Sequence, residues 1–216
     1  MRLTVSNPPH WHVKLTEGRI HLDFIIALIP AVIFALIMYG MHAARVIVLA
    51  MSTAVISEIL IRKLFKKPQA FTDGSAFLIG LLFALILPPS VPFWLVIVGA
   101  FLCIFIGKEL FGGLGSPPLN PVLVGWTILQ ISWPGHLNIN LAAAIYDLKF
   151  DFRYPLAMLK TGGIEAISDY SFIDLVLGKQ TAGLGASAII LIFIGGVYLL
   201  VRRRIHWEIP LSFAVG

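Results

Sequence analysis

The sequence predicts an all-α polytopic membrane protein with six transmembrane spans, some of them short or broken, and the start of a seventh. Of its 216 residues, 58% are hydrophobic and 12% are charged, and the mean hydropathy is +0.92. A soluble domain carries about 25% charged residues, so this composition is typical of an integral membrane protein. The Lys and Arg residues cluster beside the apolar runs. The formal charge of +5 therefore indicates membrane topology signals rather than nucleic-acid binding.

The apolar runs follow one another along a single membrane domain, residues 1–216. A polar and basic segment, residues 1–21, precedes runs at residues 22–39, 43–61, 75–87, 92–107, 119–133 and 184–201. The first run is long enough to cross a hydrocarbon core of about 30 Å as a helix. The third run makes only about 20 Å of helix, which is too short to span alone. Another apolar run begins at residue 206, and we expect the fold to continue beyond Gly216 or to be completed by another chain.

The basic residues predict the orientation of the chain. With the N-terminus in the cytoplasm, six crossings place eleven Lys and Arg residues on the cytoplasmic side and five on the other side. This excess agrees with the positive-inside rule. We therefore expect a multi-pass protein of the cytoplasmic (inner) membrane, with residues 1–21 inside and residues 134–183 as an extracytoplasmic loop.

Short spans that Gly and Pro interrupt are typical of discontinuous helices around a membrane binding site. The third run begins with Asp73-Gly74-Ser75, a polar sequence typical of a helix N-terminus. Glu58 lies four residues before Arg62, which predicts an ion pair near the interface. A buried carboxylate on an ion path is the alternative interpretation of Glu58.

Residues 108–125, KELFGGLGSPPLNPVLVG, join the fourth and fifth runs. A glycine-rich turn at this place is costly in hydrocarbon unless it lines a cavity or faces water. The glycines also suit tight packing between helices, and they lack the Lys-Ser/Thr ending of a phosphate-binding loop. No catalytic group can be assembled, the six histidines show no metal-ligand spacing, and the single cysteine, Cys103, is expected to be a small buried hydrophobe.

Several motifs occur in one order along the chain. They are Ser6 with Pro9-His10, Asp73-Gly74-Ser75-Ala76, Gly80, Leu87-Pro88-Pro89, Pro92, Trp94, Lys108, Phe111-Gly112-Gly113-Leu114-Gly115, Asn120-Pro121 and Gly125. In these motifs the chain resembles the NqrB/RnfD family, the flavin-carrying membrane subunits of the Nqr and Rnf complexes. It is most similar to the RnfD branch, which belongs to the Rnf ion-translocating electron transport complex. The likeness covers nearly the whole chain and is strongest over residues 73–125.

The resemblance implies a membrane subunit of a redox pump. Such a complex passes electrons from ferredoxin or NADH to NAD or quinone and translocates Na⁺ or H⁺. The implied partners are other membrane subunits, iron–sulfur and flavin subunits, quinone and the lipid bilayer; no nucleic acid is expected. The implied cofactor site is a cavity near the cytoplasmic face, shaped by Lys108, Gly112, Gly113, Gly115, Asn120 and Pro121, with Asp73, Gly74 and Ser75 capping the neighbouring helix. Lys108 is expected either to pair with a flavin or quinone oxygen or to snorkel to the interface.

The sequence departs from the family at the flavin anchor. Family members bond an outer FMN through its phosphate to a threonine in a Ser-Gly-Ala-Thr motif. Here the aligned residues are Asp151-Phe152-Arg153-Tyr154, with Tyr154 at the threonine position. We therefore expect no covalent FMN, and a noncovalent flavin, FMN or riboflavin, is the candidate cofactor. Pro117 also stands where the family has asparagine, Leu119 where it has phenylalanine, and Ala186 where it favours glutamate.

Two other functions stay open on the sequence. The scaffold could serve as a cofactor-free membrane anchor that docks soluble redox subunits. It could also form half of a small-solute channel or transporter, because broken helices with few charges suit a pore. In each case the chain supplies no catalytic side chains of its own, and it is enzymatic only as a subunit of an ion-translocating oxidoreductase.

Overall fold

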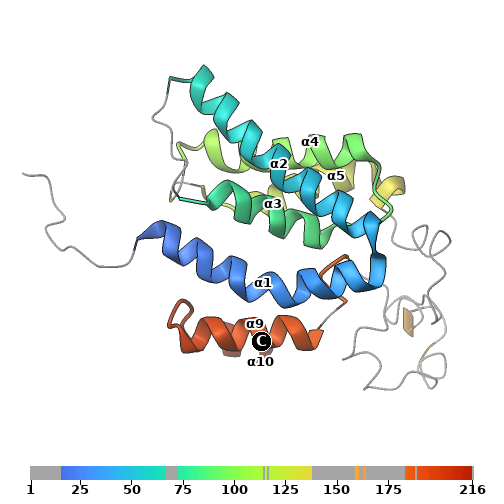
Figure 1. The fold of residues 1–216 in the computed structure, drawn as a ribbon, viewed down its shortest axis with the longest axis vertical. Coiled ribbons are helices and arrows are strands. Elements are labelled where there is room, and N and C mark those ends of the chain that lie inside the picture. Colours follow the sequence, from blue (N-terminus) through green and yellow to red (C-terminus); the bar gives the residue numbers. More distant parts are fainter. Residues whose placement is uncertain are drawn as a thin grey trace, which may run out of the picture.

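The computed structural model describes residues 16–66, 73–113, 115, 117–137, 159–160, 163, 183–187 and 189–215. Every regular element within these ranges is a helix, which confirms the all-α fold class for them. The elements in chain order are α1 (Glu17–Tyr39), α2 (Met41–Leu64), α3 (Ser75–Ile86), α4 (Phe93–Ile104), η1 (Phe105–Glu109), α5 (Pro121–Ser132), η2 (Pro134–Leu137), α9 (Ile189–Val201) and α10 (Glu208–Val215) (Figure 1). Residues 1–15 and most of the expected outer loop, 134–183, lie outside the described residues.

Two helices, α1 and α2, are long and apolar enough to cross a membrane, with mean hydropathies of 2.5 and 2.0. The other apolar helices are shorter. The 12-residue α3 confirms the predicted short helix, because Pro88 and Pro89 follow it and cannot continue it. Length and hydropathy thus identify two of the six expected spans, and the remaining four crossings stay a prediction.

The sequence predicts the last complete span over residues 184–201, and the first part of this prediction is wrong. Residues 184–187 form turns, and α9 begins only at Ile189. The reason is a tertiary contact with the end of α3. The N–H groups of Leu184 and Gly185 donate to the carbonyls of Leu87 and Leu85, at 3.0 and 2.9 Å, and these bonds hold the turn against the end of α3.

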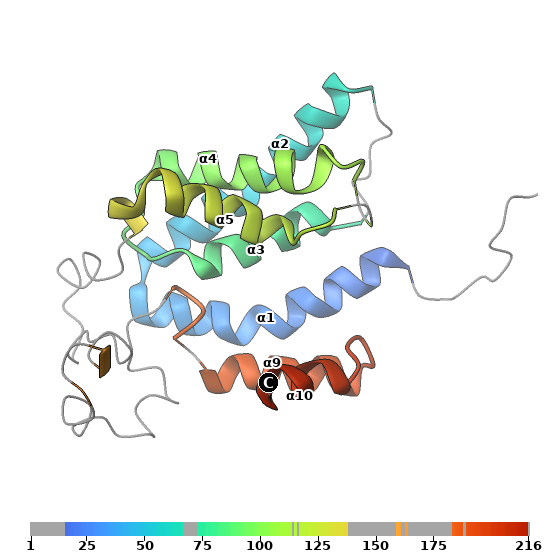
Figure 2. The same ribbon diagram turned by 180° about the vertical axis from the view of Figure 1, so that it is seen from behind.

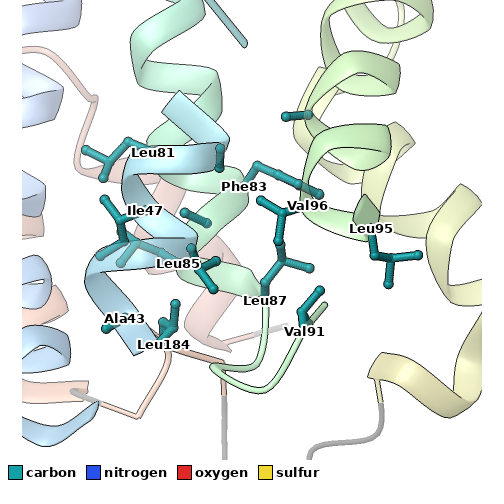
Figure 3. Close-up of a cluster of buried hydrophobic side chains, with 14 of the residues drawn as sticks. Ala43, Ile47, Leu81, Phe83, Leu85, Leu87, Val91, Leu95, Val96 and Leu184 are labelled. Carbon is teal, nitrogen blue, oxygen red and sulfur yellow. The ribbon is translucent and has the colours of Figure 1, made fainter. Parts of the chain in front are cut away.

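The helices pack in two groups on either side of α1. α2 packs on α3 and α4, α4 packs on α5, and α1 contacts α2 and α3 on one side and α9 on the other. Figures 1 and 2 show α1 between the α2–α5 group and α9. Figure 3 shows the central apolar cluster, to which α2, α3, α4 and the turn at residue 184 all contribute. Gly80 allows the close approach of α3 to α2, because a Cβ there would lie 2.8 Å from the Cα of Met51.

Helices that follow one another in the chain from α1 to α5 alternate in direction, as successive crossings require. α1, α3 and α5 begin at the end of the bundle where α2, α4 and α9 finish. At this end Nδ1 of His21 in α1 lies 2.5 Å from the carbonyl oxygen of Asp73, just before α3. A Cβ on Gly107, at the end of α4, would lie 2.6 Å from the Cα of Pro121, where α5 begins.

Asp23 joins α1 to the turn after α9 at the same end of the bundle. Its Oδ2 accepts a hydrogen bond from Nε of Arg204 at 2.6 Å, and its Oδ1 accepts one from Nη2 of Arg202 at 3.1 Å. The hydroxyl of Tyr198 lies 3.3 Å from Oδ1. Asp23 is buried. The Arg-rich turn, residues 202–204, therefore makes a structural contact with α1.

Candidate functional site

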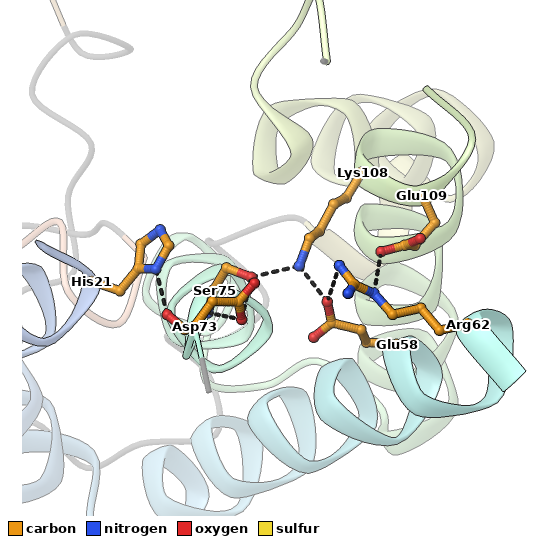
Figure 4. Close-up of polar contacts among 7 residues, drawn as sticks. All are labelled: His21, Glu58, Arg62, Asp73, Ser75, Lys108 and Glu109. Atoms are coloured by element: carbon orange, nitrogen blue, oxygen red, sulfur yellow. Dashed lines mark hydrogen bonds and ion pairs between the residues drawn. The ribbon is translucent and has the colours of Figure 1, made fainter. Parts of the chain in front are cut away.

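Four charged side chains lie together, buried, at the end of the bundle where α2 and α4 finish (Figure 4). We call Glu58, Arg62, Lys108 and Glu109 the ion cluster. Glu58 and Arg62 come from the last turns of α2, and Lys108 and Glu109 from η1. Lys108 is 1% exposed and Glu109 3%, and Glu58 and Arg62 are each 8% exposed. Such burial is rare for charged residues unless they are paired.

The ion cluster is a chain of alternating charges. Nζ of Lys108 lies 2.5 Å from Oε1 of Glu58 and 2.5 Å from Oγ of Ser75. Arg62 bridges the two carboxylates, with Nη2 at 3.1 Å from Glu58 and Nε at 2.9 Å from Glu109. The predicted ion pair between Glu58 and Arg62 is therefore confirmed, although it is buried within the protein. Of the two alternatives for Lys108, snorkelling to the interface is wrong, because its ammonium group is held inward by Glu58 and Ser75.

A π-helical turn explains how two consecutive charged residues are both buried. α4 changes at Phe105 to the wider η1, in which the N–H of Leu110 donates to the carbonyl of Phe105 at 2.9 Å. π-turns of this kind are often found at functional sites. The sequence showed Lys108 and Glu109 as the start of a turn, and the structure places both in the helix. The adjacent charges at the end of an apolar run were the only signal of this arrangement.

The N-termini of two short helices lie close to the ion cluster, and at each of them a side chain accepts a hydrogen bond from a backbone N–H. Oδ1 of Asp73 accepts from the N–H of Ser75 at 3.3 Å and from its hydroxyl at 3.1 Å. Gly74 between them has a φ of +65°, which favours glycine. At α5, Oδ1 of Asn120 accepts from the N–H of Val122 at 2.9 Å, and Pro121 occupies the first helical position.

A cavity of about 490 Å³ opens beside Lys108, between α1, α3, η1 and the start of α5. Its lining residues are His21, Ser75, Leu78, Ile79, Leu82, Lys108, Gly115, Pro117, Pro118, Leu119, Asn120, Pro121 and Val122. Five of the predicted site residues meet here: Ser75, Lys108, Gly115, Asn120 and Pro121. His21, to which no sequence motif pointed, joins them because it binds the Asp73 carbonyl. A carbonyl only accepts, so Nδ1 of His21 carries the proton in this contact.

The other predicted site residues lie outside this cavity wall. Asp73 and Gly74 precede Ser75 at the start of α3, and the Asp73 carboxylate accepts hydrogen bonds from Ser75. Gly112 and Gly113 form the turn after η1, with φ values of +106° and +104°. These φ values, rather than tight packing between helices, account for glycine at both positions. Tight packing instead explains Gly80 and Gly107.

A second, apolar groove of about 330 Å³ runs along α5 from the cavity. It is lined by Leu119, Asn120, Leu123, Val124, Thr127 and Ile128. Leu119 and Asn120 line both spaces. Leu119 therefore separates a cavity with a polar wall from an apolar surface of α5.

Only some of the residues on which the flavin predictions depend are among those that the structure describes. Tyr154 and the rest of residues 151–158 lie outside the described residues, so the expected lack of covalent FMN stays a prediction. Pro117 and Leu119, the two departures in the glycine-rich turn, both line the cavity. Ala186 is exposed in the turn that precedes α9. In the described ranges no three His, Cys, Asp or Glu side chains are grouped so that they could hold a metal ion.

Comparison with known proteins gives a family and several curated relatives. The family described as NQR2, RnfD, RnfE matches residues 4–216. The D subunit of a proton-translocating ferredoxin:NAD(+) oxidoreductase complex from Clostridium ljungdahlii is 34% identical over 215 residues, covering 96% of this chain and 65% of that protein. The D subunit of a Na(+)-translocating ferredoxin:NAD(+) oxidoreductase complex from Acetobacterium woodii is 36% identical over 212 residues, covering 97% and 66%. The D subunit of an ion-translocating oxidoreductase complex from Mannheimia succiniciproducens is 30% identical over 247 residues, covering 98% and 70%. The chain thus spans about two thirds of the length of these relatives.

Proposed function

This chain belongs to the NQR2, RnfD, RnfE family, whose members include helical membrane subunits, and we propose that it works as the D subunit of an ion-translocating oxidoreductase complex. The relatives are named for electron transfer between ferredoxin and NAD coupled to movement of protons or sodium ions. We propose the same coupled reaction here, with NADH as the alternative donor and quinone as the alternative acceptor. The chain forms no catalytic bonds in this proposal and instead holds a redox group within the membrane part of the complex.

The cavity beside Lys108 carries this proposal. Its volume of about 490 Å³ lies within the range of about 300–1,000 Å³ that small-molecule sites occupy. Leu78, Ile79 and Leu82 offer an apolar wall to a flat ring, and Lys108, Ser75 and Asn120 offer polar groups at its edge. The N-termini of α3 and α5 add their positive dipole ends on the same side.

These features fit a noncovalent flavin, FMN or riboflavin. A flavin has two apolar faces and a rim of carbonyl and ring-nitrogen acceptors, and when bound it would supply an electron-accepting and electron-donating group. The chain's own residues would hold the ring against α3, and Lys108, whose ammonium is bonded to Glu58 and Ser75, would supply positive charge at the edge of the ring. The apolar side chains of α3 and of the loop 117–121 line part of the cavity and would limit the contact of the ring with water.

The same end of the bundle is proposed to face the cytoplasm. The ends of α2 and α9 lie there, with Lys63 and the turn Arg202–Arg203–Arg204, so the described charges follow the positive-inside rule. In this arrangement six spans cross the inner membrane, the N-terminus is cytoplasmic, and soluble iron–sulfur and flavin subunits have access to the cavity side.

Visible absorption of the purified complex, followed by redox titration, tests the proposal. We expect flavin bands that titrate reversibly and that diminish when Lys108→Met is introduced, because the ring edge loses its cationic partner. The matched control is Lys63→Met, an exposed lysine of α2 that does not line the cavity. A complex that translocates ions with no flavin at this chain would instead support the cofactor-free anchor. A colourless protein that conducts solutes would support the pore.

A further inference from the structure

We infer that Arg62 and Glu109 are positioning residues that set the charge of the cavity wall and thereby tune the reduction potential of the flavin bound beside Lys108. Neither residue lines the cavity. The inference rests on the proposed function, since it concerns the redox group that the cavity is proposed to hold. It adds two residues that act on that group through Glu58 and Lys108 without touching it.

The geometry gives a fixed order from the cavity inward. Lys108 lines the cavity, and its Nζ lies 2.5 Å from Oε1 of Glu58. The same Oε1 lies 3.1 Å from Nη2 of Arg62, and Nε of Arg62 lies 2.9 Å from Oε1 of Glu109. The charges therefore alternate, positive at the wall, then negative, positive and negative.

Burial gives this order its electrostatic weight. Charges out of contact with water are screened little by solvent or salt, so each one is felt by its neighbours and at the cavity wall. The formal charges of these four side chains sum to zero. Arg62 and Lys108 both pair with Glu58, so Glu58 compensates less of the Lys108 charge at the cavity wall than it would alone. Glu109 pairs with Arg62 and so weakens this effect of Arg62.

Neutralising the two inner residues therefore has opposite consequences. Reduction adds negative charge to a flavin or to its proton donors, so a more positive surrounding favours the reduced form. Removing the charge of Arg62 leaves the wall more negative and lowers the midpoint potential. Removing the charge of Glu109 leaves it more positive and raises the midpoint potential. A simple structural role for either residue predicts no such difference in sign.

The test is a redox titration of the flavin in the purified complex carrying Arg62→Gln, Glu109→Gln, both substitutions together, or Arg62→Lys. We expect the midpoint potential of the flavin to fall in Arg62→Gln and to rise in Glu109→Gln. In the double variant and in Arg62→Lys it should stay close to that of the unchanged protein. If Arg62→Gln does not assemble, Glu109→Gln and the double variant still carry the test, because they differ by one charge. The flavin content of each preparation and its melting temperature serve as controls.

The outcomes separate this inference from the proposal on which it rests. If the protein without substitutions binds no flavin, the proposed function and this inference are both overturned. A flavin-loaded protein whose potential is the same in every variant overturns the inference alone. The inference alone is also overturned if Arg62→Gln and Glu109→Gln shift the midpoint potential in the same direction, because a shared direction would reflect a loosened site rather than its charge.

Discussion

Lys108 is a charged residue that the protein keeps almost entirely away from water, and its partners explain how. Glu58 compensates the ammonium charge, and Ser75 binds the same group from the start of α3. The lysine thus links the ends of α2 and α4 to the beginning of α3. One side chain connects three helices and also forms part of the cavity wall.

Replacing Lys108 by Met should destabilise the protein strongly. Removing one partner of a buried ion pair costs about 3–5 kcal/mol, because the other charge stays buried without compensation. Arg62 still contacts Glu58, so we expect the lower part of that range. Thermal unfolding in detergent measures the effect. The double variant Glu58→Gln with Lys108→Met should recover part of the loss, since Arg62 and Glu109 then remain as a pair; a double variant less stable than Lys108→Met would contradict this account.

Leu119→Phe should strengthen the binding of the proposed flavin. Leu119 lines the cavity at the position where the family resemblance places phenylalanine. An aromatic contact contributes about 0.5–1.5 kcal/mol beyond its buried area, which corresponds to a roughly twofold to tenfold lower dissociation constant. Flavin retention during dialysis of the purified complex measures it. Leu123→Phe is the matched control, because Leu123 lies in the α5 groove and not in the cavity.

At the level of helices, glycine marks the places where two backbones meet. Gly80 lets α3 approach α2, and Gly107 lets the end of α4 approach Pro121. Because hydrocarbon offers no hydrophobic drive for helices to associate, this close packing is a main source of their cohesion. The short α3 depends on it most, since it is too short to cross a bilayer alone.

Gly80→Ala and Gly196→Ala should therefore differ although both glycines lie inside helices. A Cβ at Gly80 would lie 2.8 Å from the Cα of Met51 and 2.9 Å from the carbonyl oxygen of Ala50, whereas a Cβ at Gly196 would have no atom within 4 Å. Overpacking of this kind costs about 1–3 kcal/mol. Gly196→Ala should be neutral or stabilising, because alanine favours the helix by about 0.5–1 kcal/mol. Equal melting temperatures for the two variants would show that the α2–α3 contact is looser than described.

Much of the arrangement of the helices could be predicted from the sequence. Proline and glycine residues mark the helix ends, so the observed limits of α3 and α5 lie within a few residues of the predicted ones. The meeting of Ser75, Lys108 and Asn120 followed from placing alternate helix ends on one side. What could not be predicted depends on contacts between distant residues. The π-turn, the late start of α9 and the bonds from Asp23 to Arg202 and Arg204 leave no periodicity or spacing in the sequence.

For the whole molecule, the alternating helices predict which ends are accessible from each side of the membrane. Lys63 lies at the proposed cytoplasmic end and Gly135 at the opposite end, and both are exposed. Single cysteines at these positions should react with a membrane-impermeant maleimide from opposite sides of oriented vesicles. The native Cys103 is buried and should stay unlabelled, which provides the internal control. Labelling of both positions from one side would contradict the alternation of α2 and α5.

The contact between α3 and the turn before α9 has a consequence for how the protein is made. The carbonyls of Leu85 and Leu87 are met by N–H groups from residues that are synthesised about a hundred positions later. An unpaired carbonyl in hydrocarbon costs several kcal/mol, roughly. The carbonyls of Leu85 and Leu87 therefore gain these two protein partners only after residues 184 and 185 have been synthesised.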